Sequence, residues 1–206
     1  YKMQPVQYKF HKDFTGKLSS YGLSAERRTP NGIKAAVIRE KGTQCERETA
    51  YALYLAGSDV KDVHMTDLAS GRETLEDVNF IVFCGGFSNS DVLGSAKGWA
   101  GGFLYNEKAK KAIDNYYARK DTLSMGICNG CQLMAELGLV YPEHEKKHKM
   151  VHNDSHKFES NFVSLEIPKN NSVMFGSLSG TKLGVWVAHG EGKFEFPYEE
   201  KEYNII

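Results

Sequence analysis

The pattern of hydrophobic and polar positions changes near residue 33. Before that point the chain is polar and irregular, and this part ends with the turn-forming pair Asn31-Gly32. Beyond it, short apolar runs suited to buried strands alternate with stretches in which apolar residues recur at helical spacing. We therefore expect residues 1–32 to be a linker from an upstream region and residues 33–206 to form one domain.

The apolar runs predict strands and helices in alternation as far as residue 138. Strands are expected at 35–38, 60–65, 80–84 and 123–127, and helices at 46–56, 108–119 and 129–137. Such alternation is typical of an α/β fold with a mostly parallel central sheet and helices on both faces. After residue 140 the pattern becomes strand-rich. Strands are expected there at 162–167, 184–188 and 193–196, with a further one starting at 203, as if the fold continued past the last residue.

Two features follow the ends of predicted strands. Gly85-Gly86 comes directly after the third strand, and Cys128 comes directly after the fourth. Ligand sites of open parallel sheets lie beyond the carboxyl ends of the strands. We therefore expect a site that contains both features.

The segment G-I-C-N-G-C-Q at 126–132 is compatible with three interpretations. Cys128 and Cys131 form a C-x-x-C pair, which after a strand and at the start of a helix suggests thiol redox chemistry. The late position of this strand in the α/β series argues against that interpretation. Half of a zinc site is a second possibility, but Cys45 and Cys84 do not provide the second ligand pair that it needs.

The third interpretation, a sharp turn that presents one reactive cysteine, fits the neighbouring residues best. Gly126 and Gly130 flank Cys128 with the small residues that a strand-to-helix nucleophile turn requires. The N-terminus of the helix favours the thiolate, and the backbone N–H of Asn129 points to where an oxyanion would form. A second N–H donor is expected from Gly85-Gly86. A plain turn with a buried cysteine stays open as the structural alternative.

Composition narrows the range of functions. Twenty-six basic residues balance 26 acidic ones, so no net charge directs the chain to nucleic acid or to a membrane. No apolar run approaches the length of a membrane span, and the N-terminus has no signal-peptide core. Four cysteines in 206 residues are too few for a disulfide scaffold. We therefore expect reduced thiols and a cytoplasmic location.

Three motifs together resemble the class I glutamine amidotransferases, which have a flavodoxin-like fold. They are F-C-G-G-F-S-N-S-D at 83–91, G-I-C-N-G-C-Q at 126–132 and V-A-H-G-E-G-K at 187–193. More narrowly, they resemble the glutaminase domains of purine-pathway ligases that carry the ATP-dependent synthetase on the same polypeptide. The resemblance implies that 33–206 are the amidotransferase domain, apparently truncated at its C-terminal end, and that 1–32 lead in from the synthetase region.

The resemblance also implies a mechanism. Cys128 would attack the side-chain amide of glutamine to give a glutamyl thioester and ammonia, and water would then release glutamate. Ammonia would pass to the synthetase, where ATP and magnesium are expected. No cofactor and no metal are expected in this domain.

Six further residues match the family motifs at positions that contact the substrate or the oxyanion. The oxyanion hole would be formed by Gly85, Gly86 and Asn129, and the glutamine would be held by Gln132, His189 and Gly190. One departure matters: the family's general base is a histidine in a His-Pro-Glu segment, which this sequence does not contain. Catalytic activity of this chain by itself is therefore in question, and His189 is not assigned as the base.

A second motif, His144-Glu145-Lys146-Lys147-His148, matches the zinc-protease pattern H-E-x-x-H. A zinc-binding helix of that kind is amphipathic and packed, whereas this segment is rich in lysine. We expect a solvated loop or a short exposed helix. Two functions other than a glutaminase stay open at this point, a thiol redox module that uses Cys128 and Cys131 and a non-catalytic interaction domain.

Overall fold

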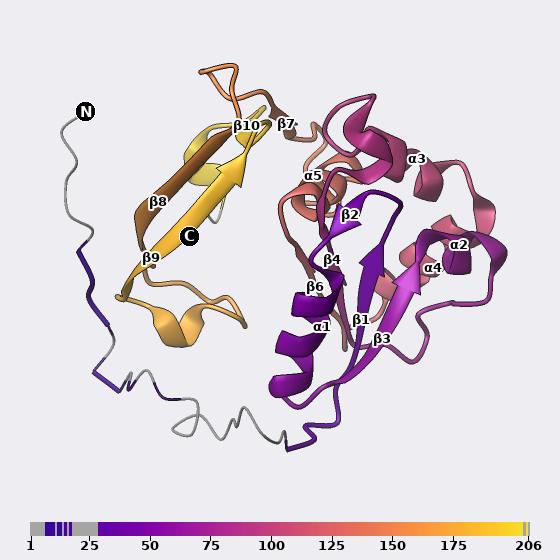
Figure 1. Ribbon diagram of the computed structural model, residues 1–206, viewed down its shortest axis with the longest axis horizontal. Helices are drawn as coiled ribbons and strands as arrows, with labels where there is room; N and C mark the ends of the chain where they lie inside the picture. The colour runs from indigo at the N-terminus through magenta and orange to yellow at the C-terminus, as the bar shows by residue number, and fades with distance from the viewer. Residues whose placement is uncertain are drawn as a thin grey trace. The chain divides into compact units, whose positions relative to one another are not determined.

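The computed structural model describes residues 7–10, 12, 13, 15, 17, 29–203 and 205. The chain divides into two compact units, one of residues 17–150 and the other of residues 1–16 with 151–206. Figure 1 labels their helices and strands. Much of the linker expected at 1–32 lies outside the described residues, so this boundary stays a prediction.

A parallel sheet of four strands forms the centre of the unit at 17–150. Its order is β3 (Asp59–His64), β1 (Lys34–Arg39), β4 (Phe80–Phe83) and β6 (Leu123–Gly126). Among the described residues of this unit, five helices accompany it: α1 (Glu46–Leu55), α2 (Met65–Ser70), α3 (Lys97–Leu104), α4 (Glu107–Ala118) and α5 (Asn129–Glu136). Helices flank the sheet, as the first two figures show. The predicted α/β class with a parallel sheet is therefore confirmed.

Strand residues alternate between the two faces of this sheet. Ala36 and Ile38 of β1 join the main core, where they meet apolar side chains of four helices, among them Leu68, Trp99, Phe103, Ile113, Tyr116 and Leu133. The intervening Val37 is also buried and faces Ala50 of α1 across a shared pocket. Burial on both faces explains why these strands read as continuous apolar runs.

A short antiparallel pair lies beyond the carboxyl ends of the parallel strands. It joins β2 (Thr43–Gln44) to β5 (Gly85–Gly86), with Thr43 opposite Gly86 and Gln44 opposite Gly85. β5 is followed by a 3₁₀ segment, η2, at Ser88–Asp91. Gly85-Gly86, which follows the third predicted strand, thus forms a short strand of its own.

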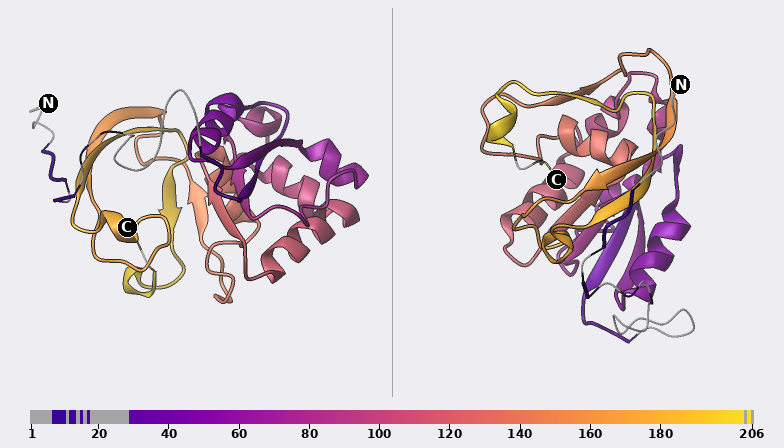
Figure 2. Two further views of the ribbon diagram at one scale, coloured as in Figure 1. Left: turned by 90° about the horizontal axis from the view of Figure 1, so that it is seen from below. Right: turned by 90° about the vertical axis from the view of Figure 1, so that its left-hand side faces the viewer.

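The unit at 1–16 and 151–206 is built around a long antiparallel pair. β8 (Glu159–Glu166) runs opposite β9 (Lys182–His189), from Glu159 against His189 to Glu166 against Lys182, and the pair is visible in both views of Figure 2. Lys9 adds an isolated antiparallel bridge to Lys182. The remaining elements are β10 (Lys193–Glu195) and the 3₁₀ turns η3 (Gly176–Leu178) and η4 (Glu200–Glu202), while β7 (Lys149–Val151) lies where the chain passes between the units.

Two local predictions are wrong. Met65 starts α2 instead of ending the second strand, because His64 caps that helix: the His64 side chain accepts from the Thr66 N–H, and Asp67 accepts from the His64 N–H. The strand expected from 203 is not found at Tyr203 or Ile205, and residues 204 and 206 lie outside the described part. Within the described ranges, no helix is long and apolar enough to cross a membrane.

Candidate active site

Cys128 lies in the turn between β6 and α5. Its backbone angles, φ 53° and ψ −108°, belong to a region that residues with a side chain rarely adopt. The residue is only partly buried, so it is not enclosed in the core. A strained, partly exposed cysteine between a strand and a helix is the arrangement that the nucleophile-turn interpretation predicts.

Both glycines that flank Cys128 are required by close backbone contacts. A Cβ atom on Gly126 would lie 2.6 Å from the carbonyl oxygen of Gly130 and 2.7 Å from the amide nitrogen of Cys131. A Cβ atom on Gly130 would lie 2.2 Å from the carbonyl oxygen of Phe83. None of these three distances is compatible with a side chain, so the G-x-C-x-G spacing has a steric cause.

Backbone hydrogen bonds fix the turn and start the helix. The Ile127 N–H donates to the Phe83 carbonyl at 3.1 Å, and the N–H groups of Cys131 and Gln132 donate to the Cys128 carbonyl at 2.9 and 3.1 Å. Asn129 is therefore the first residue of α5, and its N–H is one of the donors that a helix cannot satisfy internally. The positive end of the α5 dipole lies at Cys128 and favours a thiolate there.

The diglycine strand β5 lies directly against this turn. A Cβ atom on Gly85 would be 3.2 Å from the Cys128 Cβ, and one on Gly86, whose φ is 116°, would be 2.7 Å from the Gln44 amide nitrogen. The fold thus brings together Gly85 and Cys128, as the positions of the two motifs at strand ends predict. The roles of Gly85, Gly86 and the Asn129 N–H as oxyanion donors stay predictions.

The side chains of Asn129 and Gln132 are both buried, at 0% and 2% exposure. Asn129 Nδ2 donates to Gln132 Oε1 at 2.8 Å, and the Ser88 N–H donates to Asn129 Oδ1 at 3.0 Å. Gln132 is thus part of a buried hydrogen-bond cluster behind the turn. Its predicted contact with the substrate stays a prediction.

The cysteines differ in their surroundings. All four are free thiols. Cys84 is fully buried, as expected, and burial raises its pKa to about 12. Burial also raises the pKa of the Cys131 thiol, and the charge of Cys128 acts in the same direction. A raised pKa disfavours the thiolate of Cys131, which is the form that attacks.

The two predicted substrate residues His189 and Gly190 lie at the end of β9, in the unit that holds residues 151–206. Asn153 organises this turn. Its N–H donates to the Gly190 carbonyl at 3.0 Å, its Nδ2 donates to the His189 carbonyl at 2.6 Å, and its Oδ1 accepts from the Gly192 N–H at 3.0 Å. The substrate contacts of His189 and Gly190 stay predictions.

The segment with the H-E-x-x-H pattern forms turns and bends, so its histidines are not stacked by a helix. The expectation of a loop is confirmed, but full solvation is wrong for His148, which is 4% exposed. Among the residues that the structure describes, no group of three or more His, Cys, Asp or Glu is placed to hold a metal ion.

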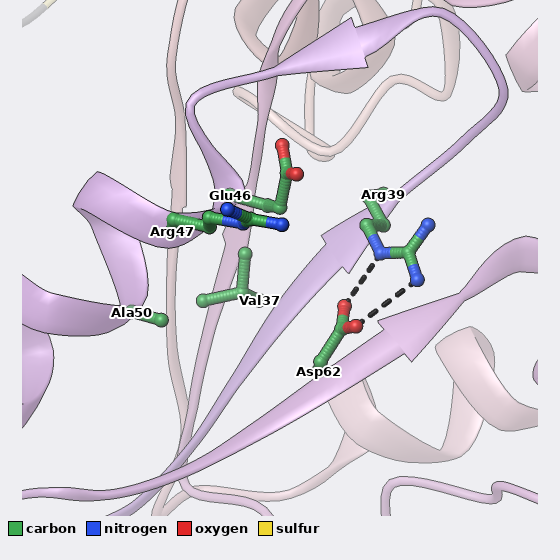
Figure 3. A pocket seen from close by; sticks show the side chains of 6 residues that line it. All are labelled: Val37, Arg39, Glu46, Arg47, Ala50 and Asp62. Carbon is green, nitrogen blue, oxygen red and sulfur yellow. Dashed lines mark hydrogen bonds and ion pairs between the residues drawn. The ribbon is translucent and has the colours of Figure 1, made fainter.

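A separate polar pocket lies between α1 and the strands β1 and β3, as Figure 3 shows. Its charged walls neutralise each other: Arg39 Nε donates to Asp62 Oδ1 at 2.7 Å, and Arg39 Nη2 donates to Asp62 Oδ2 at 3.0 Å. The residues that line it are Val37, Arg39, Glu46, Arg47, Ala50 and Asp62. None of the predicted site residues is among them, so this pocket is not the candidate active site.

Sequence reasoning missed the supporting residues Ser88 and Asp91. Both belong to the F-C-G-G-F-S-N-S-D motif, and both bind the Asn129 side chain through hydrogen bonds. Their presence in that motif was the available signal. The contact itself joins residues far apart in the sequence, which a linear pattern does not reveal.

Comparison with known proteins supports these observations. The model of the CobB/CobQ-like glutamine amidotransferase domain matches residues 32–206. The chain is 46% identical over 172 residues to a protein of Arabidopsis thaliana named probable phosphoribosylformylglycinamidine synthase, chloroplastic/mitochondrial, and 41% identical over 195 residues to one of Caenorhabditis elegans named probable phosphoribosylformylglycinamidine synthase. These matches cover 81% and 94% of this chain but only 12% and 14% of the two relatives.

Solved structures agree with the fold. The structure of PurLQS from Thermotoga maritima superposes with a TM-score of 0.65 at 30% identity, covering 80% of this chain and 69% of that one. A glutamine amidotransferase from Thermotoga maritima has a TM-score of 0.52 at 16% identity, covering 81% of this chain and 64% of that one. The second likeness concerns the fold alone.

Proposed function

The chain belongs to the CobB/CobQ-like glutamine amidotransferase family, and we propose that it hydrolyses glutamine through Cys128 to supply ammonia to a synthetase. The synthetase would be the ATP-dependent part of the same polypeptide, making phosphoribosylformylglycinamidine in purine biosynthesis. Relatives with that name support this proposal. Because this chain matches only a small share of their length, the synthetase activity would reside outside residues 1–206.

One observation carries the proposal: the strained Cys128 turn lies directly against the diglycine strand. The Gly85 Cβ position is 3.2 Å from the Cys128 Cβ, and α5 begins at the next residue. A thiolate at this point would have backbone N–H groups on two sides. That is the arrangement that stabilises the tetrahedral intermediate of acyl transfer.

In the proposed reaction, the Cys128 sulfur attacks the carbon of the glutamine carboxamide, and the carbonyl electrons move to oxygen. The N–H groups of Asn129 and of Gly85 and Gly86 would bind that oxyanion. Collapse of the intermediate expels ammonia, whose nitrogen takes up a proton, and leaves a glutamyl thioester. Attack by water then breaks the C–S bond and releases glutamate and the thiol. Because the sequence contains no His-Pro-Glu segment, we assign the proton transfers to no residue of this chain.

Gln132, His189 and Gly190 would hold the glutamine. The domain itself would need no metal or cofactor, and ATP and magnesium would bind in the synthetase part. A cytoplasmic location remains a proposal, and the Arabidopsis thaliana relative has a name that refers to the chloroplast and mitochondrion.

The proposal is tested by labelling the full-length protein with a diazoketone analogue of glutamine and mapping the modified residue. We expect modification of Cys128, with loss of glutamine hydrolysis in Cys128→Ala and nearly full hydrolysis in Cys131→Ala. Equal loss in both variants, together with a reversible disulfide, would instead indicate a redox pair. Absence of any thioester or label would indicate a non-catalytic interaction domain.

A further inference from the structure

The Asn129 side chain is the centre of a buried hydrogen-bond cluster. Its Nδ2 lies 3.2 and 3.3 Å from the two carboxylate oxygens of Asp91 and 2.8 Å from Gln132 Oε1. Its Oδ1 accepts from the Ser88 N–H at 3.0 Å. Asn129 is 0% exposed, and a buried carboxamide is stable only if its donors and acceptor are satisfied. Here every polar atom of the side chain is engaged.

This cluster joins the two halves of the proposed oxyanion hole. Asn129 directly follows Cys128, and Ser88 lies two positions after Gly86. The Phe87 N–H donates to the Gly42 carbonyl at 3.0 Å on the side of the β2–β5 pair. The backbone that leaves the diglycine strand is thus held by Gly42, directly before β2, at one residue and by Asn129 at the next.

The segment that contains Asp91 needs such anchors. Asn89, Ser90 and Asp91 have φ values of 51°, 58° and 50°, three left-handed residues in succession without a glycine. A backbone of this kind persists only where the surrounding structure determines it. Asp91 helps to hold this backbone in place, because its Oδ1 also accepts a hydrogen bond from the Ala96 N–H at 3.2 Å.

We propose that Asp91 and the Asn129 side chain form a positioning pair that holds the diglycine strand at the distance from Cys128 that oxyanion binding requires. This inference rests on the proposed glutaminase function. Asp91 supplies the acceptors that orient the Asn129 amide, and the amide oxygen then fixes the Ser88 N–H. Neither side chain would contact the glutamine, and only the Asn129–Gln132 hydrogen bond leads towards a proposed substrate residue, so the pair acts mainly on the chemical step.

A swap of the two side chains tests the pair in the full-length protein. In Asn129→Asp two carboxylates would face each other, and we expect kcat for glutamine hydrolysis to fall by about 100-fold, the size of a lost oxyanion donor, with KM changed less than about threefold. The double variant Asn129→Asp with Asp91→Asn again has an amide opposite a carboxylate. We expect its kcat to be at least about tenfold higher than that of Asn129→Asp alone. Asp114→Asn, a matched charge removal on the surface of α4, should leave kcat unchanged.

Two measurements separate positioning from general damage. Alkylation of Cys128 by iodoacetamide needs no oxyanion hole, so its rate in Asp91→Ala should stay within about twofold of wild type, whereas the added carboxylate beside the thiol would slow it in Asn129→Asp. If that variant does not fold, Asp91→Ala removes the acceptors without adding a charge, and kcat should fall about tenfold. The inference is overturned if Asp91→Ala keeps wild-type kcat, if the loss in Asn129→Asp appears in KM alone, or if Asp91→Asn rescues nothing.

The proposed glutaminase function is tested separately, by the wild-type protein and the Cys128→Ala variant in the same experiment. If wild-type protein does not hydrolyse glutamine, or if Cys128→Ala still does, the proposed function fails and the positioning pair fails with it. If those two samples behave as expected while the Asp91 and Asn129 variants match wild type, only the positioning pair is wrong.

Discussion

The carbonyl oxygen of Phe83 would be 2.2 Å from a Cβ atom on Gly130. Phe83 is the last residue of β4, and Gly130 lies in the first turn of α5. The same carbonyl accepts from the Ile127 N–H at 3.1 Å. The strand that leads into the diglycine pair and the helix that follows the cysteine are therefore in backbone contact, which sets the spacing of the candidate site.

This contact predicts a large cost for Gly130→Ala. A methyl group cannot be accommodated unless α5 moves away from β4, and overpacking of this kind costs about 3 kcal/mol of unfolding free energy. Urea unfolding measures it. Gly101→Ala is the matched control, since Gly101 is also helical and the nearest atom to its Cβ position is 3.7 Å away. That variant should be unchanged or up to about 1 kcal/mol more stable. Equal losses in the two variants would contradict the steric account.

The strained backbone of Cys128 predicts that activity and stability oppose each other. With φ at 53° and ψ at −108°, any side chain at this position is unfavourable, and glycine is not. Cys128→Gly should therefore be more stable than Cys128→Ala by about 1 kcal/mol in urea unfolding, although both should abolish glutamine hydrolysis.

Cys131 gives the matched control for that comparison. It lies in the helical part of the same turn, so Cys131→Gly should be about 1 kcal/mol less stable than Cys131→Ala. If Cys128→Gly also proves less stable than Cys128→Ala, the turn is not strained in solution.

Much of the fold could be predicted because the strongest elements have regular patterns. β1 and β4 are buried on both faces, so each appears in the sequence as an unbroken apolar run. α4 has its buried residues along one side, Ala109, Ala112, Ile113 and Tyr116, at helical spacing. The parallel arrangement then follows from the alternation of the two element types.

α2 and α3 could not be predicted in the same way. α3 has the sequence K-G-W-A-G-G-F-L, whose three glycines disfavour a helix by intrinsic propensity. It forms because Trp99 and Phe103 are fully buried, with their rings edge-on to Phe83. α2 has only six residues and starts at Met65, where the alternation of the preceding strand continues. Tertiary packing, which a local pattern does not contain, decides both.

Within the candidate site, too, local features could be predicted from the sequence and long-range contacts could not. The Cys128 turn could be predicted because Gly126 and Gly130 mark close backbone contacts in the sequence itself. The link from Asp91 to Asn129 could not, since it depends on three successive left-handed residues that are not glycine. Asn and Asp adopt this conformation more readily than most residues, but that preference does not predict three such residues in succession.

Thiol exposure predicts an order of reaction with iodoacetamide in the native chain. Cys45 is exposed and Cys128 is partly exposed, whereas Cys84 is fully buried with its pKa raised to about 12. Because the thiolate is the reacting species, Cys45 and Cys128 should be modified first and Cys84 only after unfolding. Cys131, with a pKa raised by burial, should react after Cys128. Peptide mapping by mass spectrometry at successive times gives the order, and early modification of Cys131 would favour the redox interpretation.

His148 predicts a loss of stability in mild acid. Burial lowers its pKa from the ordinary value of 6.5, with the charges of His144 and Lys147 as smaller causes. The unfolded chain therefore binds a proton at a pH where the folded chain does not, so stability is complete above pH 6.5 and declines as the pH falls towards the folded pKa. The unfolding free energy should fall between about pH 7 and pH 5, and His148→Gln should remove part of that decline.

The size and origin of this effect can be checked within the same segment. Urea unfolding at several pH values in that window, with wild type and His148→Gln side by side, gives the slope for each. His156 is exposed and belongs to the same histidine-rich stretch, so His156→Gln controls for the removal of an imidazole as such. If the two glutamine variants have identical pH slopes, burial of His148 does not contribute to acid sensitivity. A smaller slope in His148→Gln alone would show that this histidine is held neutral as a structural residue, in contrast to the metal ligand that its H-E-x-x-H pattern suggests.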